Sequence, residues 1–171
     1  MRRIAWLPLF ATTGCYQALS VGYDHRFADH GGHGFEASWT LAGGEVIGDD
    51  EPIGFGRASV AAGSWGVRMG DAFGVMVQED LGGDASFFIR PALAFLVIGG
   101  ESRSKEDLVP WVGIGGELDA GFLVPLGDAN ALEIGVRGGA DLGYVGLGTG
   151  GFVSAFIAFG WTTDGPDLYT R

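Results

Sequence analysis

Lysine, cysteine and long apolar runs are all scarce in this chain of 171 residues. Lys105 is the only lysine, although a water-soluble domain normally covers its surface with several such long charged side chains. Cys15 is the only cysteine, which excludes a disulfide within the chain. The longest apolar run, Pro91 to Gly100, is far shorter than the roughly 18 residues that indicate a transmembrane helix. Much of the protein surface is therefore expected not to face water. No segment is long and apolar enough to be a transmembrane helix.

Glycine and acidic residues are the abundant components. Glycine accounts for 33 residues, and the apolar fraction of 47% is too high for a disordered chain. The formal charge of −11 argues against nucleic acid as a partner and against electrostatic docking on anionic lipid. The length is sufficient for one domain with an interior.

The clearest pattern lies between Asn130 and Gly146, where apolar and polar residues alternate strictly. Successive side chains of a strand point to opposite faces, so this stretch predicts one long strand with an oily face and a charged, glycine-rich face. A run of this length is typical of a tilted strand that crosses a bilayer. The apolar face carries Leu132, Ile134, Val136, Gly138, Ala140, Leu142 and Tyr144, and the other face carries Glu133, Gly135, Arg137, Gly139, Asp141 and Gly143.

Seven further stretches show strand patterns separated by short turn sequences. Short connections imply antiparallel neighbours, and eight is the number of strands at which a barrel closes with its interior just filled. The predicted fold is therefore all-β, an antiparallel up-and-down β-barrel of eight strands that spans a membrane. The predicted strands cover residues 16–27, 35–41, 54–69, 73–79, 86–98, 110–124, 130–146 and 151–161.

Two of these strands contain irregular features. Arg57 and Arg68 lie in the same predicted strand, 54–69, and both are expected to face inward. Arg57 faces inward only if the odd positions of the strand do, whereas Arg68 faces inward only if the even positions do. A bulge within residues 62–66 resolves this conflict, and a short helix there is the alternative. Gly70 and Asp71 are then predicted to form a tight turn. Pro91 has no N–H group to donate, so it is expected at a bulge or near a rim.

The polar faces decide whether the barrel is soluble or membrane-bound. They alternate charge with glycine, which suits a crowded lumen, and they carry both signs of charge, including arginines that form forked pairs with buried carboxylates. One such arginine placed on the lipid face would cost roughly 2–4 kcal/mol at the bilayer midplane. The predicted lumen network consists of Asp24, Arg26, Glu36, Arg57, Arg90, Glu117, Asp119, Glu133, Arg137 and Asp141.

Aromatic residues near strand ends add to the membrane interpretation. Trp39, Tyr144, Phe159 and Trp161 fall where interfacial girdles lie. The layout from Tyr16 to Trp161 resembles the small eight-stranded outer-membrane barrels of the OmpA and OmpX type. This resemblance rests on layout rather than on a motif. It implies a membrane anchor, an adhesin, a small pore or, rarely, a lipid-modifying enzyme, and assigns none of these roles to a particular residue.

The first residues have the layout of an export signal, with Arg2 and Arg3 before a short apolar core. The small residues that precede Cys15 resemble a bacterial lipoprotein cleavage box, in which the cysteine becomes the lipidated first residue. Ordinary signal cleavage nearby and a buried free thiol are the alternatives. The expected organisation is a signal peptide over 1–14, a barrel over 15–161 and a polar tail over 162–171.

Three candidate chemical sites are weak. His25, His30 and His33 are crowded within one stretch, but their spacing matches no standard metal site, so a solvated turn is expected instead. The glycines of 146–151 satisfy G-x-G-x-x-G without the helix that a phosphate site needs. Glu117 and Asp119 share one strand face, as a carboxylate pair in a hydrolase could. A salt-bridge network is the preferred interpretation of that pair.

The sequence thus predicts a structural protein of the bacterial outer membrane, without catalysis and without a cofactor. The lipid bilayer is the expected partner, no nucleic acid is expected, and protein partners stay open. The alternative is a lipid-tethered soluble barrel in the periplasm that binds a hydrophobic ligand. A membrane-embedded lipid-modifying enzyme is a third hypothesis.

Overall fold

Strands and short connections make up the described part of the chain. The computed structural model describes residues 15–27, 31–43, 52–81, 85–102, 108–127, 130–145 and 150–163. Within these ranges no helix is long and apolar enough to cross a membrane. The strands are β1 (Cys15–Phe27), β2 (Gly32–Gly43), β3 (Ile53–Gly63), β4 (Gly66–Asp80), β5 (Ser86–Ser102), β6 (Leu108–Pro125), β7 (Asn130–Val145) and β8 (Gly150–Thr162).

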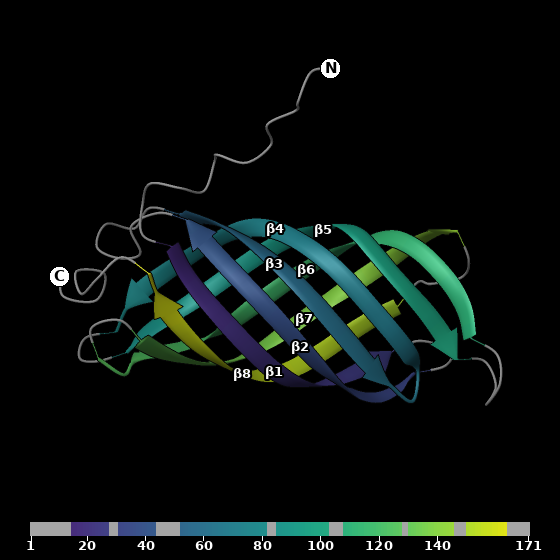
Figure 1. Ribbon diagram of the computed structural model, residues 1–171, viewed down its shortest axis with the longest axis horizontal. Helices are drawn as coiled ribbons and strands as arrows, with labels where there is room; N and C mark the ends of the chain where they lie inside the picture. Colours follow the sequence, from purple (N-terminus) through teal and green to yellow (C-terminus); the bar gives the residue numbers. More distant parts are fainter. Residues whose placement is uncertain are drawn as a thin grey trace, which may run out of the picture.

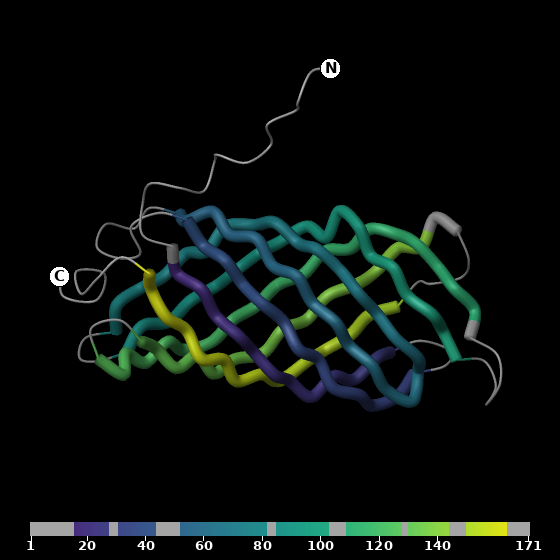
Figure 2. Tube along the Cα trace, viewed as in Figure 1, coloured from purple at the N-terminus to yellow at the C-terminus, as the bar shows by residue number. Residues whose placement is uncertain are grey.

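Each strand pairs antiparallel with the next, and β8 returns to pair with β1. The closing register runs from Tyr16 opposite Thr162 to Phe27 opposite Gly151. Figure 1 shows β8 beside β1, and Figure 2 shows the strands crossing the long axis at a tilt. A closed sheet leaves no edge strand unpaired. The prediction of an all-β, up-and-down barrel of eight antiparallel strands is confirmed.

The side chains of β7 define which face of the sheet is outside. Ile134 and Val136 are 51% and 53% exposed, whereas Glu133 and Arg137 are 1% and 2% exposed. The same alternation holds in β2 and β8, whose burial patterns switch at almost every residue. The wall of the barrel is therefore oily outside and polar inside, as predicted. This is the reverse of the arrangement in a soluble barrel.

The boundary between β3 and β4 differs from the prediction. The predicted strand over 54–69 is two strands joined by a turn at Ser64 and Trp65. The predicted bulge within 62–66 and the alternative helix are both wrong. Gly70 and Asp71, predicted as a turn, lie inside β4.

A tight hairpin explains the conflict of parity that the bulge was meant to resolve. Gly63 pairs with Gly66, so every odd residue of β3 lies opposite an even residue of β4. Arg57 and its partner Ala72 consequently face the lumen together, and so does Arg68. Gly66 has a φ of 125°, a backbone conformation that favours glycine.

Pro91 lies in the interior of β5, neither at a bulge nor at a rim, so that prediction is wrong. The β4–β5 ladder is interrupted beside Pro91, between the pairs Gly74–Ala92 and Val77–Ile89. The register is the same on both sides of this gap, because a missing N–H removes a hydrogen bond without shifting the strand. The bulge of β5 occurs instead at Phe95 and Leu96, which both face outward.

Most strands extend beyond their predicted ends. β2 begins at Gly32, β5 continues to Ser102, and Thr162, predicted to be in the tail, is the last residue of β8. The predicted signal peptide and Lys105 lie outside the described residues. Strand lengths range from 11 residues in β3 to 18 in β6. A tilted strand needs about 9–11 residues to cross a bilayer, so every strand is long enough.

We expect Gly66→Ala to weaken the barrel, because a Cβ at this position would overlap the carbonyl oxygen of Gly100 and the backbone angle disfavours any side chain. Such strained positions cost about 1–3 kcal/mol each. Urea unfolding in lipid vesicles measures the loss. Gly116→Ala is the matched control, since no atom lies within 4 Å of its added Cβ. Equal stability of the two variants would contradict the turn assignment.

Candidate functional site in the barrel lumen

The lumen of the barrel holds a cluster of buried charges that we call the lumen network. It comprises six carboxylates and five arginines, contributed by every strand except β8. Each of these residues is at most 8% exposed. Its members are Asp24, Arg26, Glu36, Arg57, Arg68, Arg90, Glu117, Asp119, Glu133, Arg137 and Asp141.

Asp119 on β6 is the centre of the network. It accepts hydrogen bonds from Arg57 on β3 and from Arg137 on the neighbouring β7, where the Nε–Oδ1 distance is 2.9 Å. The Nε atom of Arg90 lies 3.3 Å from its Oδ2 atom. Arg137 also donates to Glu36 on β2. Ion pairs through Asp119 therefore connect strands from different sides of the barrel.

Toward the end where β1 begins, the network continues through Glu133. Arg90 donates to this carboxylate from Nη2 at 2.7 Å, and the hydroxyl of Tyr16 donates to it as well. Tyr16 is the first inward residue of β1 that the structure describes. A phenol therefore belongs to the series of polar contacts on this side of the lumen.

Toward the opposite end, the network continues through Glu117 and Asp141. Glu117 accepts hydrogen bonds from Arg57 and from Arg68, whose Nη2 atom lies 2.7 Å from Oε1. Arg68 also donates from Nε to Asp141 at 2.9 Å. Arg26 donates to Asp141 at 3.2 Å and forms an ion pair with Asp24 at 3.8 Å. One continuous series of ion pairs therefore follows the lumen.

Aromatic rings fill the space around the guanidinium groups. Cation–π contacts of this kind stabilise a desolvated arginine in addition to its ion pairs. Inward glycines leave room for the rings: a Cβ at Gly135 would lie 2.9 Å from Cζ of Phe156. The distances from guanidinium carbon to ring centroid are 4.2 Å for Arg26–Trp65 and Arg90–Phe88, 4.9 Å for Arg68–Phe152 and 5.1 Å for Arg137–Phe156.

Bulky side chains close both ends of the charged region. Trp65 and Trp111 are buried at the end that contains the β3–β4 turn. At the end where β1 begins, an apolar layer lies inside the barrel. This layer consists of Tyr16, Ile53, Phe55, Met76, Phe88 and Leu123. Side chains therefore occupy the described lumen at its centre and toward both ends, as expected for a barrel of eight strands.

All ten residues of the predicted network lie buried in the lumen, and ion pairs or hydrogen bonds bring them together. One member of the network, Arg68, and one hydrogen-bond partner of the network, Tyr16, were missed. Arg68 was noticed only as a conflict of parity, and a two-residue turn at Ser64 and Trp65 would have placed it inside. Tyr16 precedes the alternating part of β1, and no signal in the sequence indicated its hydrogen bond to Glu133.

Of the other predicted candidates, the structure places two histidines away from the lumen. Cys15 is the first residue of β1, and its side chain is outside the description. His25 and His33 meet on the outer face, with 3.1 Å between their Nδ1 atoms, whereas His30 lies outside the described residues. The described ranges contain no group of three or more His, Cys, Asp or Glu side chains that could hold a metal ion.

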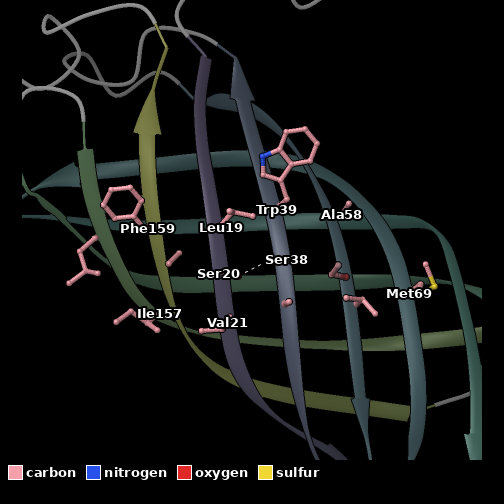
Figure 3. Close-up of a pocket in the computed structure, with 14 residues that line it drawn as sticks. Leu19, Ser20, Val21, Ser38, Trp39, Ala58, Met69, Ile157 and Phe159 are labelled. Atoms are coloured by element: carbon pink, nitrogen blue, oxygen red, sulfur yellow. Dashed lines mark hydrogen bonds between the residues drawn. The ribbon is translucent and has the colours of Figure 1, made fainter.

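The outer wall has a shallow apolar groove of about 750 Å³. Figure 3 shows Leu19, Trp39, Ala58, Met69 and Phe159 along it. Short side chains such as that of Ala58 leave the hollow between larger neighbours. The groove faces away from the lumen, so it is no interior pocket for a ligand.

Asp71 departs from the apolar character of the outer wall. It is exposed on β4, between the outward side chains of Met69 and Phe73. A carboxylate on a lipid-facing surface is unfavourable, although less so than an arginine. No contact among the described residues explains its presence there.

Comparison with solved structures identifies the same fold in two bacterial barrels. Neisserial surface protein A matches with a TM-score of 0.72 and 9% identity, over 88% of this chain and 99% of that protein. The N-terminal β-barrel domain of Pseudomonas aeruginosa OprF matches with a TM-score of 0.51 and 9% identity, over 86% and 97% respectively. No protein-family model and no curated protein matches the sequence. At this level of identity the likeness concerns the fold.

We expect Arg137→Leu to destabilise the barrel by about 3–5 kcal/mol, because it removes the arginine that donates to buried Glu36 and one of the three arginines around buried Asp119. Unfolding by urea in lipid vesicles measures this loss. Val136→Leu, one residue away on the outer face, is the control and should be nearly neutral. Unchanged stability of Arg137→Leu would mean that Arg137 does not support the lumen network.

Proposed function

We propose that this chain is a structural protein of the bacterial outer membrane whose role requires no catalysis. The observation that supports this best is the distribution of side chains on β7, with Ile134 and Val136 outside and Glu133 and Arg137 inside. Such a wall is stable where the surroundings are apolar and the lumen satisfies its own charges. The similarity of fold to Neisserial surface protein A and OprF supports the same location.

Aromatic residues at both ends of the outer wall support a transmembrane position. Trp39 and Phe159 face outward toward the end where β1 begins. Tyr23, Phe27 and Phe35 are exposed toward the opposite end. Rings with an apolar body gather at the two interfaces of a membrane barrel, where one side is oily and the other wet.

The state of the acidic groups supports a role without catalysis. Glu117 and Asp119, the pair that could have served as acid and base, each accept hydrogen bonds from two arginines. A carboxylate held between guanidinium groups is a poor proton donor or acceptor for a substrate. We infer that these residues hold the barrel together.

The packing of the lumen supports a barrel that conducts no ions. The lumen network fills the centre, and Trp65 and Trp111 lie at one end with the apolar layer at the other. An ion would have to displace arginine–carboxylate pairs that are buried on all sides.

A lipid anchor on Cys15 is compatible with this position. Residues 1–14 are expected to be removed as a signal peptide, which would make Cys15 the first residue of the mature protein. Because Cys15 is also the first residue of β1, its lipid would enter the bilayer at the rim of the barrel. The anchor would then add to an attachment that the strands already provide.

The alternative of a lipid-tethered soluble barrel is less well supported. It requires an apolar interior for a hydrophobic ligand and a charged outer wall. The structure has charges inside, and its apolar groove lies on the outer wall (Figure 3).

We expect the Cys15→Ser variant to remain in the outer-membrane fraction after an alkaline wash, because the strands hold it there without a lipid. Cell fractionation followed by immunoblotting measures this distribution, with the wild-type chain as control. Release of Cys15→Ser into the soluble periplasmic fraction would favour the tethered soluble barrel.

We expect the folded protein to produce no unitary currents in planar bilayers bathed in potassium chloride, because the lumen is filled. The measurement is made with protein whose folded state is checked by its migration on gels before and after heating. Stable unitary currents from the folded form would contradict a closed lumen, without altering the membrane assignment.

A further inference from the structure

Two histidines that are separated in sequence form a direct pair at the rim of the barrel. His25 on β1 lies opposite His33 on β2 in the strand register. Their ring centroids are 4.6 Å apart, and a hydrogen bond of 3.1 Å joins the two Nδ1 atoms. The pair lies near the β1–β2 connection, at the end opposite to the start of β1 (Figure 1).

The separation of the two nitrogens matches the bite of a divalent transition-metal ion. Imidazole nitrogen binds Zn²⁺ at about 2.0–2.1 Å, so two ligands of a tetrahedral ion lie roughly 3.3 Å apart and two at a right angle roughly 2.9 Å apart. The observed Nδ1–Nδ1 distance of 3.1 Å lies between these values. We propose that His25 and His33 form a two-imidazole clamp for such an ion on the outer rim.

Neighbouring aromatic rings contact both imidazoles in this arrangement. Tyr23 stacks on His33 with centroids 5.5 Å apart, and Phe27 contacts the edge of His25 at 4.7 Å. The backbone N–H of His33 donates to the hydroxyl of Ser64, whose own N–H donates to the carbonyl of His33 at 3.0 Å. Ligands that are already ordered lose less conformational entropy when an ion binds.

Charge and access also favour an ion at this position. Arg26 is adjacent to His25 in sequence but points into the lumen, where it pairs with Asp141. Its positive charge is therefore directed away from the clamp. His33 is exposed on the outer face near the rim, where water at the membrane interface can fill the remaining coordination positions. Open positions of this kind suit Cu²⁺, Ni²⁺ and Zn²⁺, for which imidazole is a good ligand.

The test is a titration of the folded full chain in detergent micelles with Cu²⁺, Ni²⁺ or Zn²⁺, using a purification tag without histidine. We expect calorimetry to give one ion per chain for at least one of these metals. His25→Gln and His33→Gln should each weaken binding by about tenfold or more, since each removes one of two protein ligands. Acidification should weaken it too, because protonated imidazole cannot bind a metal.

His30→Gln is the matched control, because it removes the third histidine of the chain and leaves His25 and His33 in place. It should retain the binding that depends on His25 and His33. With Cu²⁺ bound to the wild-type chain, electron paramagnetic resonance should show coupling to imidazole nitrogen that is lost in the double variant His25→Gln/His33→Gln. Unchanged affinity of the folded double variant, or no binding by the wild-type chain to any of the three ions, would overturn the proposal.

Discussion

Pairing of the backbone is the constraint on which this structure depends. In apolar surroundings the N–H and C=O groups of a strand can be satisfied only by neighbouring strands, so the sheet must close on itself. The pairing of β8 with β1 achieves this closure. Once the sheet is closed, the parity of each residue decides whether its side chain faces the lumen or the outside. The alternation of the sequence then makes one set of positions oily and the other charged.

The lumen network follows from that division. Five arginines and six carboxylates lie inside a barrel that is too narrow to hydrate them fully, so each charge depends on a partner. Buried ion pairs often contribute little net stability. Here we infer that they favour the correct register of the strands over shifted registers. A shift of one residue in any charged strand would move its arginines to the lipid face and its leucines inside. The sequence therefore disfavours every alignment in which a strand is shifted by an odd number of residues.

The irregular places show where local patterns are insufficient. The opposite parity of Arg57 and Arg68 is equally compatible with a bulge in one strand or with a hairpin between two. The pairing of Gly63 with Gly66 decides for the hairpin. Pro91 could have ended a strand, yet closure keeps β5 paired on both of its sides and confines the loss to a gap in one ladder.

The sequence by itself determined the strand count, the oily and charged faces, and the membership of most of the lumen network, because alternation is a property of consecutive residues. The tertiary structure decided which charges pair. Arg57 and Glu117 lie on β3 and β6, and only the tilt and register of the closed barrel bring them into contact. It also decided that His25 faces His33, since cross-strand alignment depends on the whole hairpin. The face on which a residue lies follows from its position in its own strand, whereas the charged group with which it pairs depends on how the barrel closes.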